Sequence, residues 1–324
     1  MSVLKQNDLA KRVLLRSMSR SSPQTAATHS DRVVLGIGLM VAFCVIAPLL
    51  DVSAKLASDQ IPVAQITTSR LVIQTVLMAP LIVPLGHGFS VPWRLIAPLT
   101  LRAIFLLTST YCFVAAISVM PIADALAIVF VEPFILLVLG KWLFNEQIGP
   151  RRLGAAVVGF VGVILVIQPS FAAFGALALF PLATAFSFAG YMLITRSLSR
   201  QIEPVAMQFQ TALIGSLLCM PVMAAGSIWS ITALEPVWPQ GVYWTWLFGV
   251  GLFATISHLL MTYALSFAPS ATLAPLHYLE IVSSVFFGYL VFSDFPNQTA
   301  LCGMLVIIGC GFYIFLREQK LEQR

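Results

Sequence analysis

The fold of this chain is decided by Pro121-Ile-Ala-Asp-Ala-Leu-Ala-Ile-Val-Phe-Val-Glu132, which has a second copy at Pro269-Ser-Ala-Thr-Leu-Ala-Pro-Leu-His-Tyr-Leu-Glu280. The two glutamates lie 148 residues apart (280 minus 132), and the same shift places Glu146 on Asp294. Each copy holds its glutamate inside an apolar run. A duplicated unit with a buried acid in each copy is a common construction of membrane carriers, whose binding site lies where the copies meet.

The composition predicts an integral membrane protein. Hydrophobic residues make up 59% of the 324 residues and charged residues only 10%, against about 25% charged residues in soluble domains. Most of the apolar runs are long enough to cross a hydrocarbon core of about 30 Å. The runs lie at 33 to 53, 61 to 84, 96 to 118, 121 to 142, 153 to 168, 174 to 195, 204 to 226, 243 to 266, 270 to 292 and 299 to 316. We therefore expect an all-α fold with ten transmembrane helices and no soluble domain.

The basic residues fall at alternate connections and at both ends of the sequence. Arg94, Arg151 and Arg196 are examples, whereas the opposite connections carry acids such as Asp59 and Glu235. Because basic loops stay in the cytoplasm, we expect both termini to be cytoplasmic. The net charge of +5 then reflects topology and does not indicate nucleic acid as a partner.

The runs divide into two five-helix halves, residues 33 to 168 and 174 to 316, between cytoplasmic tails at 1 to 32 and 317 to 324. Because five is odd, equivalent helices of the two halves must point in opposite directions. This predicts an inverted repeat about an axis in the membrane plane. The Arg- and Ser-rich tail leaves a mitochondrial presequence open as an alternative.

Three ionisable residues are predicted near the middle of the membrane: Glu132, Glu280 and Arg70. Glu132 lies about 16 Å along its helix from the outer end, at 1.5 Å per residue. A charge at that depth costs several kcal/mol, so it should face a cavity or a partner. Both glutamates are candidates to bind substrate or protons. Arg70 is a candidate for the same site, or for a structural ion pair with one of the two glutamates.

A polar stripe follows the ninth run, where His277, Glu280, Ser283 and Ser284 share one helix face. Such stripes line cavities or form hydrogen bonds between helices, and we expect this one to line a cavity. Four tyrosines are deep enough to be pocket candidates: Tyr111, Tyr191, Tyr263 and Tyr278. His258, in the eighth run, is either a packed polar residue or a ligand.

Other spacings make smaller predictions. Asp51 and Lys55, four apart at the outer end of the first run, predict a local ion pair or an outer gate residue. Glycines such as Gly162 and Gly303 favour close approach of two helices. The five cysteines form no CxxC pattern, so neither a disulfide framework nor a metal site is expected. No cofactor is predicted either.

The chain resembles the EamA-type carriers of the drug/metabolite transporter superfamily. The resemblance covers residues 33 to 316 and rests on the ten runs, the two repeats and the matching segments Leu143-Phe-Asn-Glu146 and Val291-Phe-Ser-Asp294. It implies a carrier of the bacterial inner membrane that works by alternating access. The central cavity would be lined by helices one, three, four, six, eight and nine, with Glu132 and Glu280 facing it.

The resemblance implies transport of a small polar metabolite, and the specific prediction is uptake of a vitamin such as riboflavin. Export of amino acids or drugs is the alternative within the same class. A membrane-embedded enzyme is the alternative of another class, although no GxGxxG, GxxxxGK[ST], HExxH or GxSxG sequence favours it. Protons are the candidate coupling ion, and the pattern leaves the oligomeric state open.

Overall fold

The structure, a computed structural model, describes residues 24–83, 92–132, 150–198, 201–267 and 276–322, together with 134, 135, 138, 139 and 273. Within these ranges the chain forms helices and no strand. Most of the predicted N-terminal tail lies outside them, as do Glu146 and most of the segment from Pro269 to Pro275.

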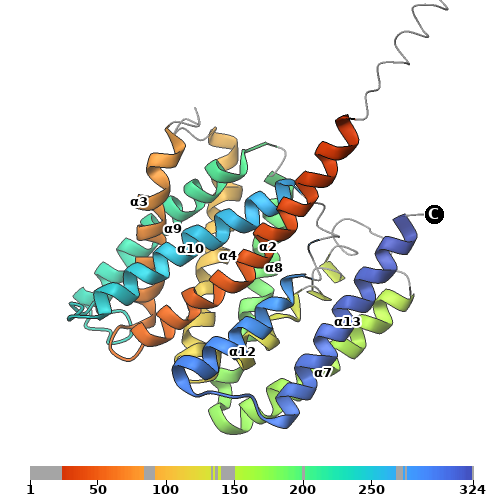
Figure 1. The fold of residues 1–324 in the computed structure, drawn as a ribbon. Helices are drawn as coiled ribbons and strands as arrows, with labels where there is room; N and C mark the ends of the chain where they lie inside the picture. Colours follow the sequence, from red (N-terminus) through yellow and green to blue (C-terminus); the bar gives the residue numbers. More distant parts are fainter. Residues whose placement is uncertain are drawn as a thin grey trace, which may run out of the picture.

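The helices follow the predicted apolar runs. In chain order they are α2 (Gln24–Ala57), α3 (Val63–Ile82), α4 (Trp93–Ile117), α5 (Ile122–Val129), α7 (Pro150–Phe174), the 3-10 helix η1 (Gly175–Leu179), α8 (Phe180–Leu198), α9 (Pro204–Ile228), α10 (Tyr243–Phe267), α12 (Leu279–Phe292) and α13 (Gln298–Glu322) (Figure 1). The fifth run is longer than predicted, because α7 continues to Phe174 before η1 leads into α8.

Five stretches are long and apolar enough to cross a membrane, judged by length and composition. They are Val33–Ala57, Trp93–Ile117, Val157–Thr195, Pro204–Ile228 and Tyr243–Ala264, and the third of them contains parts of both α7 and α8. The prediction of an all-helical protein with several membrane spans is confirmed at this level. Ten spans and an inverted repeat stay predictions.

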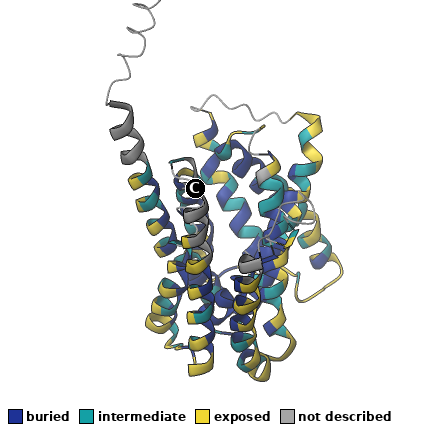
Figure 2. Cartoon of the chain, turned by 90° about the vertical axis from the view of Figure 1, so that its right-hand side faces the viewer, coloured by how far each residue is buried: buried dark blue, intermediate teal, exposed yellow. Residues whose placement is uncertain are grey.

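Helices that are far apart in the sequence pack in pairs. The most extensive pairings join α2 with α10, α7 with α13, α4 with α8, and α3 with α9 (Figure 1). In addition, α12 packs on α2 and α5 packs on α8. Buried residues gather on the helix faces that point into the bundle, while exposed residues lie on its outside (Figure 2).

Two glycines set the crossing of α7 and α13. A Cβ atom on Gly303 would lie 2.5 Å from the carbonyl oxygen of Gly162, and one on Gly162 would lie 3.0 Å from the carbonyl oxygen of Gly303. Only hydrogen fits at this point, so the predicted close approach is confirmed for this pair. Gly309 on the same helix differs, since a Cβ there would meet nothing within 4 Å.

We expect Gly303→Val to destabilise the folded protein by about 1–3 kcal/mol, the usual cost of overpacking. The added side chain would force the α7 and α13 backbones apart. Thermal unfolding of the detergent-solubilised protein measures the effect. Gly309→Val is the matched control, with an unfolding midpoint close to that of the unmodified protein, and equal midpoints for the two variants would contradict the assigned crossing.

Candidate functional site

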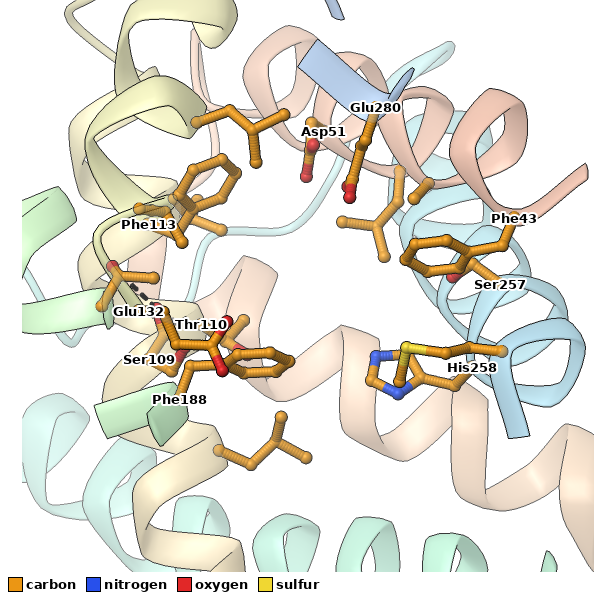
Figure 3. A pocket seen from close by; sticks show the side chains of 18 of the residues that line it. Phe43, Asp51, Ser109, Thr110, Phe113, Glu132, Phe188, Ser257, His258 and Glu280 are labelled. Carbon is orange, nitrogen blue, oxygen red and sulfur yellow. Dashed lines mark hydrogen bonds between the residues drawn. The ribbon is translucent and has the colours of Figure 1, made fainter. Parts of the chain in front are cut away.

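A cavity of about 150 Å³ lies among the inward faces of the helices (Figure 3). Its walls come from α2, α4, α8 and α10, from the end of α5 and the residues after it, and from the beginning of α12. These elements correspond to the first, third, fourth, sixth, eighth and ninth apolar runs, the six that the family resemblance implies. The second run adds one side chain, Arg70 of α3.

Five of the predicted site residues line this cavity: Glu132, Glu280, Arg70, His277 and His258. Arg70 lies in α3 and His258 in α10, Glu132 follows α5, His277 precedes α12, and Glu280 is in the first turn of α12. Glu132 and Glu280 are 6% and 7% exposed, so both acids face the cavity rather than bulk solvent. The structure therefore brings the two duplicated glutamates to one space.

The two predicted serines, Ser283 and Ser284, and the predicted tyrosines do not line the cavity. Ser284 is fully buried in α12, and its hydroxyl has no partner among the described residues. The Tyr278 ring packs against that of Phe130 in a tilted arrangement, with centroids 5.1 Å apart, and covers Gly311. Its side chain points away from Glu280 because residues two apart on a helix differ in direction by about 200°. Tyr111 lies half-buried in α4.

Arg70 is held by two neutral side chains. Its Nη1 donates to the hydroxyl of Thr110, and its Nη2 lies 2.8 Å from Nε2 of His258. Because a guanidinium only donates, Nε2 must accept, so His258 is neutral in this arrangement. The sequence leaves Glu132 and Glu280 open as ion-pair partners of Arg70, but neither lies within ion-pair distance of it. Arg70 Nε has no hydrogen-bond partner among the described residues.

Glu280 has a partner from its own segment. Its Oε2 lies 2.9 Å from Nε2 of His277, three residues earlier, as the predicted polar stripe requires. The His277 ring contacts Phe43 and Phe130, with centroid distances of 5.4 and 5.3 Å. These aromatic contacts hold the imidazole, and through it the carboxylate, at the cavity wall.

Asp51 is a site residue that sequence reasoning placed elsewhere. The predicted local ion pair with Lys55 is wrong, because Lys55 Nζ lies 2.7 Å from Asp294 Oδ2 instead. Asp51 turns inward, lines the cavity and lies near Glu280 (Figure 3). Its carboxyl group has no hydrogen bond to a described residue. The cavity thus carries three carboxyl groups and one guanidinium.

Arg102 of α4 is a second residue that sequence reasoning missed. It is fully buried outside the cavity and donates to Tyr191 Oη at 2.6 Å, Thr195 Oγ1 at 2.8 Å, the Met207 carbonyl oxygen at 3.3 Å and the Thr211 hydroxyl. Its guanidinium also lies over the Tyr191 ring. Because these groups belong to α4, α8 and α9, Arg102 links three helices. The sequence did contain a signal for this residue, because Arg102 is an arginine inside the third apolar run.

Comparison with known proteins relates this architecture to transporters. Over 286 residues the chain is 25% identical to an S-adenosylmethionine uptake transporter of Rickettsia bellii, covering 88% of this chain and 95% of that protein. It is 26% identical over 283 residues to a riboflavin transporter of Brucella anthropi, covering 86% and 98%. A pseudopaline exporter of Pseudomonas aeruginosa is 24% identical over 285 residues, covering 86% and 96%.

A solved crystal structure superposes on this one with a TM-score of 0.62, covering 90% of this chain and 99% of that chain. The two sequences are 18% identical, so this likeness concerns the fold. The sequence profile of the EamA-like transporter family matches residues 34–168 and again residues 174–316. With nearly the whole chain matched, this multi-pass membrane protein belongs to the EamA-like transporter family.

Proposed function

We propose that the protein is a secondary transporter that takes up a small polar metabolite across the inner membrane by alternating access. In this proposal ten transmembrane helices form two inverted five-helix repeats, residues 33 to 168 and 174 to 316, with both termini cytoplasmic. Glu280, Glu132, Arg70, His277 and His258 bind substrate or protons at the interface of the repeats. Asp51 joins them as a third acid.

The packing of the helices supports the inverted repeat. By order in each half, α2 is equivalent to α8, α3 to α9, α4 to α10, α5 to α12 and α7 to α13. Exchanging each helix for its equivalent turns the pair α2 and α10 into the pair α8 and α4, and both pairs pack. The same exchange turns α3 and α10 into α9 and α4, and α12 and α2 into α5 and α8, all of which pack. It leaves the pairs α3 with α9 and α7 with α13 unchanged. This regularity is expected of two halves related by a twofold axis.

The charge of the cavity carries the substrate proposal. Three carboxyl groups, those of Asp51, Glu132 and Glu280, face two possible cationic partners, Arg70 and His277, and His277 already contacts Glu280 at 2.9 Å. Buried charges must be compensated, so the cavity favours a substrate with a surplus of positive charge. S-adenosylmethionine, the cargo named for the Rickettsia relative, has a sulfonium and an ammonium group for the acids and a carboxylate for Arg70.

Riboflavin is the second candidate, and the aromatic lining favours it. Phe43, Phe113, Phe130 and Phe188 face the cavity and could stack on a planar ring system. The uncharged flavin brings no positive charge to the surplus of acids, however. We therefore place the cationic metabolite first.

Uptake of labelled S-adenosylmethionine into proteoliposomes tests the proposal. We expect saturable uptake, recovery of chemically unchanged substrate inside, and competition by S-adenosylhomocysteine that is weaker by about tenfold or more, the ratio that about 1.4 kcal/mol produces. This competitor lacks only the sulfonium methyl group and its charge. Equal competition would contradict a role for the acids, inhibition by riboflavin alone would favour the second candidate, and a converted product would indicate an enzyme.

A further inference from the structure

Lys55, at the end of α2, connects three elements at the outer end of the bundle. Its Nζ lies 2.7 Å from Asp294 Oδ2 and donates to the carbonyl oxygen of Met120 at 3.0 Å. The same ammonium lies 4.7 Å from the centre of the Phe292 ring. Because Met120 precedes α5 and Phe292 ends α12, Lys55 joins α2, α5 and α12 in one contact.

The end of α12 is shaped to present Asp294. Ser293 adopts a left-handed conformation with φ 57°, and its amide donates to the Tyr289 carbonyl oxygen at 3.0 Å. The Asp294 amide donates to the Gly288 carbonyl oxygen at 3.3 Å. This C-terminal turn reverses the chain and points the carboxylate back to Lys55. The Asp294 side chain is 32% exposed, so the ion pair lies at the edge of the bundle.

Asp124 is a second acid within reach of this cluster. It lies in the first turn of α5, four residues and so about one helical turn after Met120, whose carbonyl oxygen accepts from Lys55 Nζ. It is 5% exposed, and its Oδ1 has no hydrogen-bond partner among the described residues. A buried carboxyl oxygen without a partner is costly, so packing stability alone does not account for Asp124.

We propose that Asp124 is the alternative partner of Lys55 in the transport cycle, taking its ammonium when the end of α12 moves away and the cavity opens at this end. This inference rests on alternating access. Lys55 keeps its contact with the Met120 carbonyl oxygen, one helical turn from Asp124, and only exchanges carboxylates. Without that exchange, opening would leave a largely buried ammonium uncompensated, which would hold the transporter closed.

Labelling of a cysteine in the cavity tests this exchange. Val114→Cys, introduced after replacement of the five native cysteines, places a thiol on the cavity wall near the outer end of α4. A membrane-impermeant thiol reagent is added outside intact cells. We expect Asp124→Asn to slow labelling, and Asp294→Asn to speed it, each by at least about fivefold, the change that roughly 1 kcal/mol produces.

Asp59→Asn is the matched control, because Asp59 is an exposed acid in the turn after α2 and changes the charge at the same end. It should label at the rate of the unmodified protein. Equal labelling of the Asp124→Asn and Asp59→Asn variants would overturn the exchange. The effect of substrate on labelling of the unmodified protein tests alternating access separately, so failure of the exchange and failure of the transport proposal give different results.

Discussion

Replacing Glu280 with glutamine is expected to reduce uptake into proteoliposomes by about 100-fold while the protein still folds. The substitution removes the negative charge that pairs with His277 at 2.9 Å, and truncating one partner of a buried charge pair costs roughly 2–5 kcal/mol. If protons are coupled through this acid, residual uptake should also lose its dependence on an imposed pH gradient. Initial rates with and without the gradient measure both effects.

Two variants make the Glu280 result specific. Glu235→Gln makes the same chemical change at an exposed position in the loop between α9 and α10 and should transport normally. Glu132→Gln tests the duplicated partner, which lines the cavity without His277 as a bonded neighbour and should lose less activity. Normal rates and normal pH dependence in both the Glu280 and Glu132 variants would show that neither acid acts in transport.

Replacing Arg70 with methionine is expected to reduce uptake by at least about 100-fold, the loss expected for Glu280→Gln. The change removes the one guanidinium of the described cavity wall and leaves three carboxyl groups facing one another. It also removes the donors to Thr110 and His258. Arg70→Lys should restore part of the rate, because an ammonium keeps the charge but not the fork of donors.

The second buried arginine provides the control for Arg70. Arg102→Lys disturbs an equally buried guanidinium that does not line the cavity. We expect it to lower the unfolding midpoint while the KM for uptake stays near that of the unmodified protein. Arg70→Lys, in contrast, should raise the KM. If both lysine variants change stability alone, Arg70 is a structural residue and not part of the binding site.

Two features of the site could be predicted from the sequence, one from the long-range repeat and one from spacing within a single helix. The repeat indicated that Glu132 and Glu280 would meet, and the three-residue spacing indicated the contact of His277 with Glu280. Tyr278 belongs to the same segment, yet helix geometry turns it toward Gly311. The direction of Tyr278 relative to Glu280 follows from the helix alone, whereas its contact with Gly311 depends on how α13 packs.

The partners of the charged residues could not be read from spacing. Lys55 and Asp51 lie one turn apart on α2, which favours a local pair, but the pair forms with Asp294, 239 residues away. That choice depends on how closely α2 and α12 pack, which no local pattern contains. The same holds for Arg102, whose partners on α8 and α9 meet only after three helices have assembled.

The pairing of helices also has a consequence for biosynthesis. The most extensive pairings each join one helix from residues 34–168 to one from residues 174–316. Helices α2, α3, α4 and α7 are therefore translated before the surfaces that cover them. Until the second half follows, Arg70 lacks His258 and Arg102 lacks its partners on α8 and α9, so we expect the half-made chain to be the form most open to proteolysis.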